Sequence, residues 1–147
     1  MMSANKILLT SRAELNLLGK KIKRDGINTC DYHSYVTPKK YMISIKKNKD
    51  IYKLIKQSGV FCINFINENN EILKEIEKYN SEFIDKFSKL SISREECNKL
   101  DCPRITWALK HIECEVIEER EHEEYVEIIG NILYSIKKPL ENSLNQS

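Results

Sequence analysis

The chain has 147 residues, of which 24 are lysine or arginine and 22 are aspartate or glutamate, so its formal net charge is only +2. This balance excludes the strongly basic class of proteins that neutralise many phosphates. Hydrophobic residues make up 41% and glycine and proline number 4 and 3, which is typical of a globular domain and not of a disordered chain. We predict one domain over residues 1–139, followed by a polar tail at 140–147.

The first predicted element is a short strand at Lys6–Thr10. The most basic run, Lys20–Gly26, is interpreted as a solvated hairpin that turns at Asp25-Gly26, because this dipeptide favours tight turns. Nucleic-acid binding is the alternative interpretation of this run. It is disfavoured because no aromatic residues are interleaved with the lysines and the whole chain is nearly neutral.

The central part of the chain predicts a strand, a helix and a second strand. Residues Tyr41–Lys46 alternate in polarity, as in a half-buried strand. Residues Asp50–Ser58 have apolar side chains at helical spacing, with Asp50 as the expected N-cap and Gly59 as the expected C-terminal stop. The β-branched and aromatic residues of Val60–Ile66 predict a buried strand.

A second helix is expected to begin at Asn69 or Asn70, followed by a short helix within Glu82–Leu90. The polar segment Ser91–Arg104 is predicted to be a loop. Two long strands should follow, at Ala108–Ile117 and Tyr125–Ile136, joined by a polar hairpin tip at 118–124. Because strands and helices do not alternate regularly, a doubly wound parallel sheet is disfavoured, and a small antiparallel barrel or sandwich with helical insertions fits better.

The five cysteines form no CxxC pair, and no histidine is placed at metal-ligand spacing, so we expect no metal site. An odd number of scattered cysteines indicates reduced thiols and therefore a cytoplasmic protein. No apolar run approaches the roughly 20 residues that cross a bilayer, so we expect no membrane association. The cysteines are Cys30, Cys62, Cys97, Cys102 and Cys114.

Common catalytic motifs such as GxGxxG, GxxxxGK[ST], HExxH and GxSxG are absent. The order of several short motifs over Ile7–Tyr134 instead resembles the flavin reductase-like, FMN-binding split-barrel family, which includes flavoredoxin-like proteins. The matching motifs are Asn28-x-Cys30 with Ser34, Lys49 to Ile55, Phe61 to Asn64, Asp85-Lys86-Phe87, and Cys102-Pro103-Arg104-Ile105 followed by Ile112-Glu113-Cys114.

The resemblance implies a mainly β (α+β) fold, a Greek-key split β-barrel with two or three inserted helices. It also implies a homodimer that binds FMN at the subunit interface. Lys49 corresponds to a basic residue of the family that contacts the phosphate. Two positions after it the family usually has a threonine that binds the phosphate, whereas this chain has Ile51, which cannot donate a hydrogen bond. Catalytic residues are not assigned. The cofactor-binding residues implied by the resemblance are Asn28, Cys30 and Asn64 near the ring, Ser34, Thr37, Lys49 and Lys86 near the ring or phosphate, and His122 as a counterpart of the family's hairpin histidine.

The first functional hypothesis is an oxidoreductase of the flavin reductase type. Such a protein would take electrons from NADH or NADPH and pass them to a small-molecule or redox-protein acceptor, with the flavin supplying the chemistry. The alternative is an FMN-binding electron carrier without nicotinamide reductase activity. A third hypothesis is a flavin-free barrel with a structural or nucleic-acid-binding role. The absence of the family's threonine, replaced here by Ile51, and a shortened segment at Thr37–Tyr41 favour it.

Overall fold

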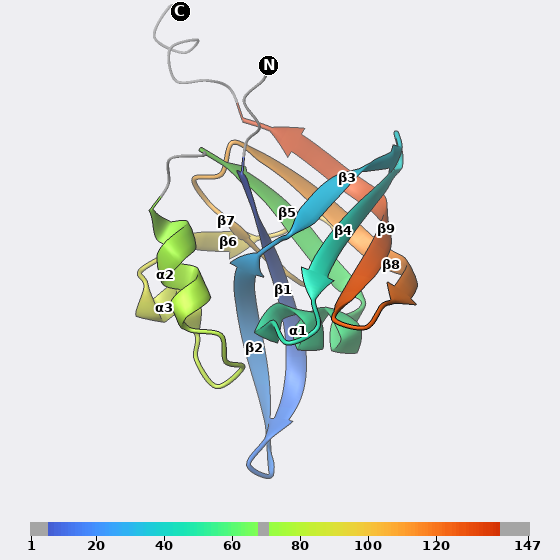
Figure 1. Cartoon of the computed structure of the whole chain (residues 1–147). Coiled ribbons are helices and arrows are strands. Elements are labelled where there is room, and N and C mark those ends of the chain that lie inside the picture. The colour runs from blue at the N-terminus through green and yellow to red at the C-terminus, as the bar shows by residue number, and fades with distance from the viewer. Residues whose placement is uncertain (1–5, 68–70, 139–147) are drawn as a thin grey trace, which may run out of the picture.

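The computed structural model describes residues 6–67 and 71–138. Its main feature is a seven-stranded antiparallel sheet in the order β2-β1-β5-β8-β9-β4-β3, with three short helices and a small two-stranded sheet, β6-β7 (Figure 1). The elements in chain order are β1 (Lys6–Leu17), β2 (Lys20–Thr29), β3 (Tyr32–Thr37), β4 (Lys40–Lys46), α1 (Asp50–Ser58), β5 (Val60–Ile66), α2 (Ile72–Lys78), α3 (Lys86–Lys89), β6 (Arg94–Glu96), β7 (Pro103–Ile105), β8 (Lys110–Glu121) and β9 (Tyr125–Lys137).

The large sheet curls around one apolar core. Side chains as far apart in the sheet as Leu9 on β1 and Ile43 on β4 belong to this same core, together with Ile112 on β8. Helix α1 lies at one end of the curled sheet and inserts Ile51 and Leu54 into the core (Figure 1). The predicted mainly β split-barrel fold is therefore confirmed.

A second apolar layer covers the outer face of β1, β2 and β5. On β1, Ile7 and Leu9 face the barrel core, whereas Leu8 faces this outer layer, as the two-residue period of a strand requires. Helices α2 and α3 and the β6-β7 hairpin supply Ile76, Phe87 and other side chains to the layer, on one side of the barrel (Figure 1). The segment Ile7–Ser11 of β1 is consequently buried on both faces.

The predicted turn at Asp25-Gly26 is wrong. Strand β2 runs straight through these residues, and the chain reverses instead at Leu18 and Gly19, both with positive φ, as a two-residue type I′ hairpin requires. Gly26 has a packing role, because a Cβ atom there would lie 2.1 Å from Cδ1 of Leu54. The glycine allows α1 to approach β2 closely.

Other boundaries differ from the sequence prediction in length. The first strand extends to Leu17. The predicted loop Ser91–Arg104 contains the short strand β6 and the first two residues of β7. Helix α3 lies inside the predicted segment Glu82–Leu90 and is capped by the carboxylate of Asp85. The expected caps of α2, at 69 and 70, lie outside the described residues.

Helix α1 has the predicted bounds but a different N-terminus. Lys49 occupies the N-cap position without a side-chain cap, and the carboxylate of Asp50 points into the protein. The predicted stop at Gly59 is confirmed, since this residue has φ 77° and its N–H donates to the carbonyl oxygen of Ile55 at 2.7 Å.

Within residues 6–67 and 71–138, no helix is both long and apolar enough to cross a membrane. The predicted single domain over 1–139 stays a prediction. The polar tail at 140–147 lies outside the described residues.

Candidate functional site

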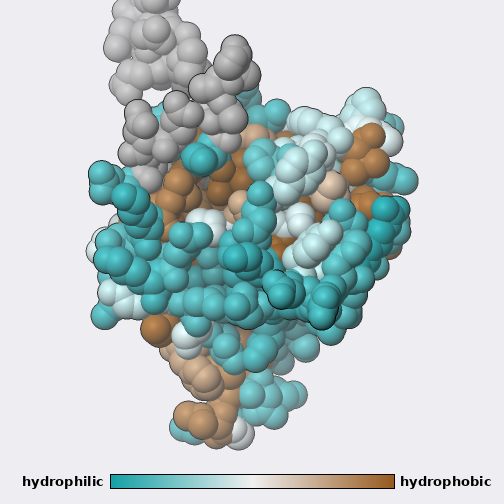
Figure 2. Space-filling model, in the orientation of Figure 1, coloured by the Kyte–Doolittle hydropathy of each residue, from teal (hydrophilic) through white to brown (hydrophobic). Residues whose placement is uncertain are grey.

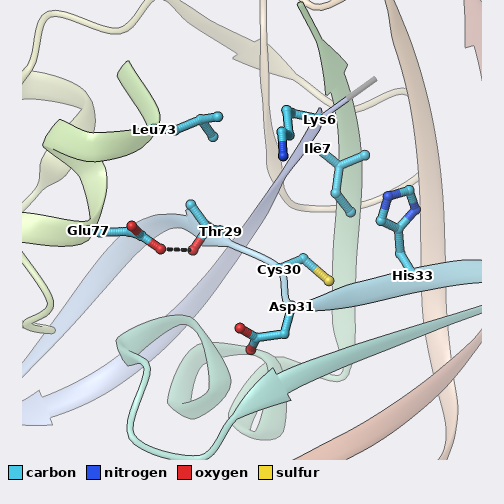
Figure 3. Close-up of a pocket in the computed structure, with 8 residues that line it drawn as sticks. All are labelled: Lys6, Ile7, Thr29, Cys30, Asp31, His33, Leu73 and Glu77. Carbon is cyan, nitrogen blue, oxygen red and sulfur yellow. Dashed lines mark hydrogen bonds between the residues drawn. The ribbon is translucent and has the colours of Figure 1, made fainter. Parts of the chain in front are cut away.

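An open cleft of about 390 Å³ lies where β2 ends and β3 begins. One wall comes from this connection, and the other comes from the start of β1 and from α2 (Figure 3). The cleft therefore joins segments that are distant in sequence. Its lining residues are Lys6, Ile7, Thr29, Cys30, Asp31, His33, Leu73 and Glu77.

Thr29 connects the two walls of the cleft through its hydroxyl group. Its Oγ1 donates to Oε2 of Glu77 at 2.9 Å and accepts from Nζ of Lys49 at 2.8 Å. The same ammonium donates to the Thr29 carbonyl oxygen at 3.1 Å and lies 3.6 Å from Oδ2 of Asp31. Figure 3 shows Asp31 pointing from the cleft toward α1. Lys49 is thus held beside the cleft by several oxygen atoms.

Cys30 and His33 form an uncharged part of the lining at neutral pH. Burial raises the pKa of Cys30 to about 11, and its thiol donates to the Tyr32 carbonyl oxygen at 3.0 Å. Burial lowers the pKa of His33, whose Nδ1 lies 2.7 Å from the hydroxyl oxygen of Tyr41. The thiol therefore stays protonated and the imidazole stays neutral, which suits a flat, largely apolar ring system more than an ion.

A second open cleft, of about 370 Å³, lies at the start of α1. Four lysines line it, and Lys49 is the one that also contacts Thr29 and Asp31 of the first cleft. Surface ion pairs hold two of the others, Lys47 with Glu121 and Lys53 with Glu82. Figure 2 shows a broad hydrophilic band across this face of the molecule, with apolar areas above it. The lysines are Lys47, Lys49, Lys53 and Lys56.

Between the two clefts lies a buried polar network centred on Asp50. Its Oδ1 accepts from the amide nitrogen of Asn28 at 2.8 Å, and its Oδ2 lies 2.8 Å from Nζ of Lys86. The backbone N–H of Ser81 also donates to Oδ2, at 3.0 Å. Burial lowers the pKa of Lys86, and the neighbouring Asp50 opposes this shift. The network fixes the start of α1, and hence the position of Lys49.

The structure brings together four of the eight residues that the sequence assigned to cofactor binding. Cys30 lines the first cleft and Lys49 lies beside it, while Asn28 and Lys86 lie in the network below. Within the described structure, Lys86 and Asn28 face Asp50 and not solvent, since both are about 1% exposed. Their direct contact with a cofactor stays a prediction.

The remaining four residues do not line the cleft. Asn64 is buried and holds β1 and β7 together, donating to the Leu8 carbonyl oxygen and accepting from the Ile105 N–H at 2.8 Å. Ser34 and Thr37 lie further along β3, with Thr37 at the turn into β4. His122 is in the exposed β8-β9 tip, 3.1 Å from a carboxylate oxygen of Glu127. Their roles in cofactor binding stay predictions.

Several lining residues were not assigned by the sequence analysis. Thr29 and His33 lie within the polar stretch that contains Asn28 and Cys30. Their closeness in sequence to these two assigned residues was a signal that could have identified them. Lys6 and Glu77 carry no such signal, because only the fold places them beside this stretch. The described residues contain no group of three or more histidine, cysteine or acidic side chains that could hold a metal ion.

The curled antiparallel sheet has the fold of a flavin reductase-like split barrel. Residues 19–137 match the family described as flavin reductase like domain, so the chain belongs to this family. No curated protein matches the chain by sequence. The resemblance inferred from the short motifs is therefore confirmed.

Solved structures of low sequence identity share the fold. Flavoredoxin of Desulfovibrio vulgaris (Miyazaki F) has a TM-score of 0.75 and 20% identity, over 91% of this chain and 70% of that one. An NADH:FAD oxidoreductase of Streptomyces globisporus C-1027, solved with NAD and FAD fragments, has a TM-score of 0.70 and 14% identity, over 92% and 76%. An FMN-binding protein from Thermus thermophilus has a TM-score of 0.74 and 12% identity, over 90% and 70%.

Proposed function

We propose that this chain binds FMN and is an oxidoreductase of the flavin reductase type. In this proposal it takes electrons from NADH or NADPH and passes them to a small-molecule or redox-protein acceptor. The observation that carries the proposal is the position of Lys49 between two clefts of different character, in a chain that belongs to the flavin reductase family. When bound, the flavin supplies the hydride and electron chemistry, and the protein binds and orients it.

The first cleft fits the ring system of a flavin. Its lining combines the apolar side chains of Ile7 and Leu73 with the neutral Cys30 and His33. The charged side chains that also line it are Lys6, Asp31 and Glu77. A planar heterocycle needs apolar contact on its faces and a few polar groups at its edge, and the lining provides both. Figure 3 shows Cys30 and His33 on the same wall, opposite Leu73.

The lysine-lined cleft at α1 fits the phosphate. In the proposed mode the ring occupies the first cleft, and the phosphate lies toward Lys49 and the lysines beyond it. Charge-assisted hydrogen bonds from ammonium groups are among the strongest that a phosphate can accept. This arrangement needs no hydroxyl at Ile51, whose side chain is fully buried in the barrel core.

We further propose that the active form is a homodimer with the flavin near the interface. Strand β3 is an edge strand and exposes Tyr35 and Val36, and β9 exposes Leu133 and Ile136. These two strands flank β4 in the sheet, and large exposed apolar side chains on one region of a sheet are typical of surfaces that associate. Analytical ultracentrifugation would test this proposal, since a monomer at micromolar concentration would contradict it.

The decisive experiment is the visible absorption spectrum of the protein after incubation with FMN and removal of free flavin. We expect a yellow protein whose flavin bleaches on addition of NADH or NADPH under anaerobic conditions. Parallel titrations with FMN and FAD would establish which flavin is preferred. A preparation that stays colourless with both flavins would contradict flavin binding and favour a flavin-free barrel.

The electron-carrier alternative differs in one measurable step. Stopped-flow reduction by a nicotinamide is compared with reduction by a redox-protein donor. Protein that retains FMN but is reduced only by the protein donor would support the carrier and contradict the reductase.

The predicted cytoplasmic location is a separate proposal, tested by fractionation of cells that produce the protein.

A further inference from the structure

Three of the five cysteines gather in one buried cluster outside both clefts. Cys62 lies on β5, Cys97 follows β6, and Cys102 precedes β7. All three are free thiols in the structure. Because neither cleft includes them, the proposed flavin chemistry does not explain why they are together.

The β6-β7 hairpin places Cys97 directly opposite Cys102. Glu96 pairs with Pro103 in the antiparallel register, and one residue further along the N–H of Cys97 donates to the carbonyl oxygen of Cys102 at 2.9 Å. Opposed residues of an antiparallel pair have Cα atoms about 4.5–5.5 Å apart. This separation lies within the range of about 4.4–6.8 Å that a disulfide bond spans.

The two thiols also meet around one oxygen atom. The Sγ atom of Cys97 lies 3.8 Å from the carbonyl oxygen of Pro103, and the Sγ atom of Cys102 lies 3.4 Å from the same oxygen. Both side chains therefore point to the same side of the hairpin. The opposed register and this shared orientation are those that a disulfide bond across the hairpin requires.

Two charged side chains hold the loop between the cysteines. The buried carboxylate of Glu113 accepts from the backbone N–H groups of Asn98 and Lys99, both at 2.7 Å. Nη1 of Arg12 donates to carboxylate oxygens of Glu96 and Asp101 at 2.6 and 2.8 Å. The residues that flank each cysteine are thus fixed, which keeps the two thiols in register.

The three thiols are not equivalent chemically. Cys97 is 9% exposed, whereas Cys62 and Cys102 are fully buried. The pKa of Cys97 is lowered because the thiols of Cys102 and Cys62 donate hydrogen bonds to its sulfur, whereas burial raises the pKa of both donors. Since the thiolate is the reactive form, Cys97 is the thiol that reacts first.

We propose that Cys97 and Cys102 are a redox modification site that forms a reversible disulfide bond when a hydroperoxide oxidises Cys97. The thiolate of Cys97 attacks one peroxide oxygen, the O–O bond breaks, and the leaving oxygen takes a proton to become water or an alcohol. Cys102 then attacks the sulfur of the sulfenic acid, the S–O bond breaks, and the hydroxide leaves as water with the thiol proton. The two thiols lose two electrons in total, which the peroxide accepts.

The test uses the full-length reduced protein, treated with increasing hydrogen peroxide and then alkylated and digested with trypsin. Trypsin cleaves after Lys99, between the two cysteines, so the peptides Glu95–Lys99 and Leu100–Arg104 separate unless a disulfide joins them. We expect the joined pair to appear first, with a loss of two thiols per chain. Dithiothreitol should restore both peptides.

Two variants separate the steps. In the double variant Cys102→Ser with Cys62→Ser, neither neighbouring thiol can attack the sulfenic acid, so dimedone should trap it on Cys97 in the peptide Glu95–Lys99. The matched control is Cys114→Ser, which replaces another buried cysteine and should leave the joined pair unchanged. Tryptic peptide mapping of the protein without substitutions tests the proposal even if either variant fails to fold.

Three results would overturn the proposal. The first is accumulation of sulfinic or sulfonic acid at Cys97 without a joined peptide pair. The second is a disulfide from Cys97 to the peptide of Cys62, Cys30 or Cys114 in a yield equal to that of the Cys97–Cys102 pair. The third is a joined pair that dithiothreitol does not reduce.

Discussion

Lys86 and Asp50 form an ion pair inside the protein, with 2.8 Å between Nζ and Oδ2 and side-chain exposures of 1% and 5%. The pair links α3 to the start of α1, across 36 positions of sequence (86 − 50). It is the only polar interaction that Nζ of Lys86 makes among the described residues. The position of Lys49, and hence the geometry between the two clefts, depends on this buried contact.

The first prediction is that Lys86→Met destabilises the protein strongly. The substitution leaves the Asp50 carboxylate buried without its counter-ion, and removal of one partner of a buried pair costs about 3–5 kcal/mol. The double variant Lys86→Met with Asp50→Asn should recover part of this loss, since no unpaired charge remains. Urea unfolding measures all three proteins.

Lys89→Met is the matched control for this prediction, because it removes an exposed lysine from the same short helix. Its free energy of unfolding should change by less than about 1 kcal/mol. Equal losses in the two single variants would show that the buried pair contributes nothing specific.

The strands and α1 could be predicted from sequence because their signals are local. Tyr41–Lys46 and Val60–Ile66 differ from the observed strands by at most one residue, since alternation and β-branched content are properties of the segment itself. The same holds for α1, whose apolar spacing and terminal Gly59 are sufficient to define it. The family resemblance then identified the fold from the order of such segments.

The site was only partly predictable, because its contacts join distant segments. Sequence motifs identified Cys30 and Lys49 but not Glu77, which reaches Thr29 across 48 positions. At Asp25-Gly26 the sequence predicted a turn that the structure does not contain. The glycine is present because α1 packs closely there, with Leu54 against the backbone. At Gly26 tertiary packing overrides the local turn propensity, whereas the contact of Glu77 with Thr29 exists only in the folded chain.

A second prediction concerns Gly130 on β9. A Cβ atom at this position would lie 2.8 Å from Cβ of Cys114 and 3.1 Å from two ring atoms of Phe61. Because a Cβ atom is fixed to the backbone, side-chain rotation does not relieve the contact with Cys114. We expect Gly130→Ala to cost about 1–3 kcal/mol in urea unfolding, as overpacking of a core does.

The comparison for this prediction is Gly26→Ala. There the new methyl group meets the terminal Cδ1 atom of Leu54, which has rotational freedom that a Cβ atom lacks. Its loss of stability should therefore be smaller, and Leu54→Ala in the same chain should relieve the clash. A larger loss for Gly26→Ala than for Gly130→Ala would contradict this interpretation of the two contacts.

A third prediction is loss of stability in mild acid through His111. Its Nε2 lies 2.6 Å from the carbonyl oxygen of Ile105, whereas its Nδ1 is buried with no hydrogen-bond partner among the described residues. Burial, with Arg104 and Lys138 nearby, lowers the pKa of His111 below the ordinary value of 6.5. Protonation in the folded state would place a proton on an atom that has no acceptor.

The sign of the effect follows from proton binding. Between the folded pKa of His111 and 6.5, the unfolded chain binds more protons than the folded chain, so stability rises with pH in this window and falls on acidification. His111→Gln removes the titrating group and should flatten this part of the pH profile. An unchanged slope in His111→Gln would refute the assignment.

The last prediction is that Lys49→Met weakens FMN binding more than it weakens the fold. A charge-assisted hydrogen bond contributes about 1.5–3 kcal/mol, and each 1.4 kcal/mol is about tenfold in affinity, so Kd for FMN should rise at least tenfold. Lys99→Met removes an exposed lysine from the β6-β7 loop, outside both clefts, and should leave Kd unchanged. Fluorescence titration of FMN measures both variants.

Salt dependence separates a phosphate contact from a general effect of charge. The net charge of the whole chain is only +2, so attraction for FMN has to come from local lysines and not from a long-range positive field. For the unmodified chain we expect Kd to rise with ionic strength, and for Lys49→Met we expect a shallower slope. If both proteins show the same slope, the phosphate does not bind at Lys49, and the lysine-lined cleft at α1 does not hold it.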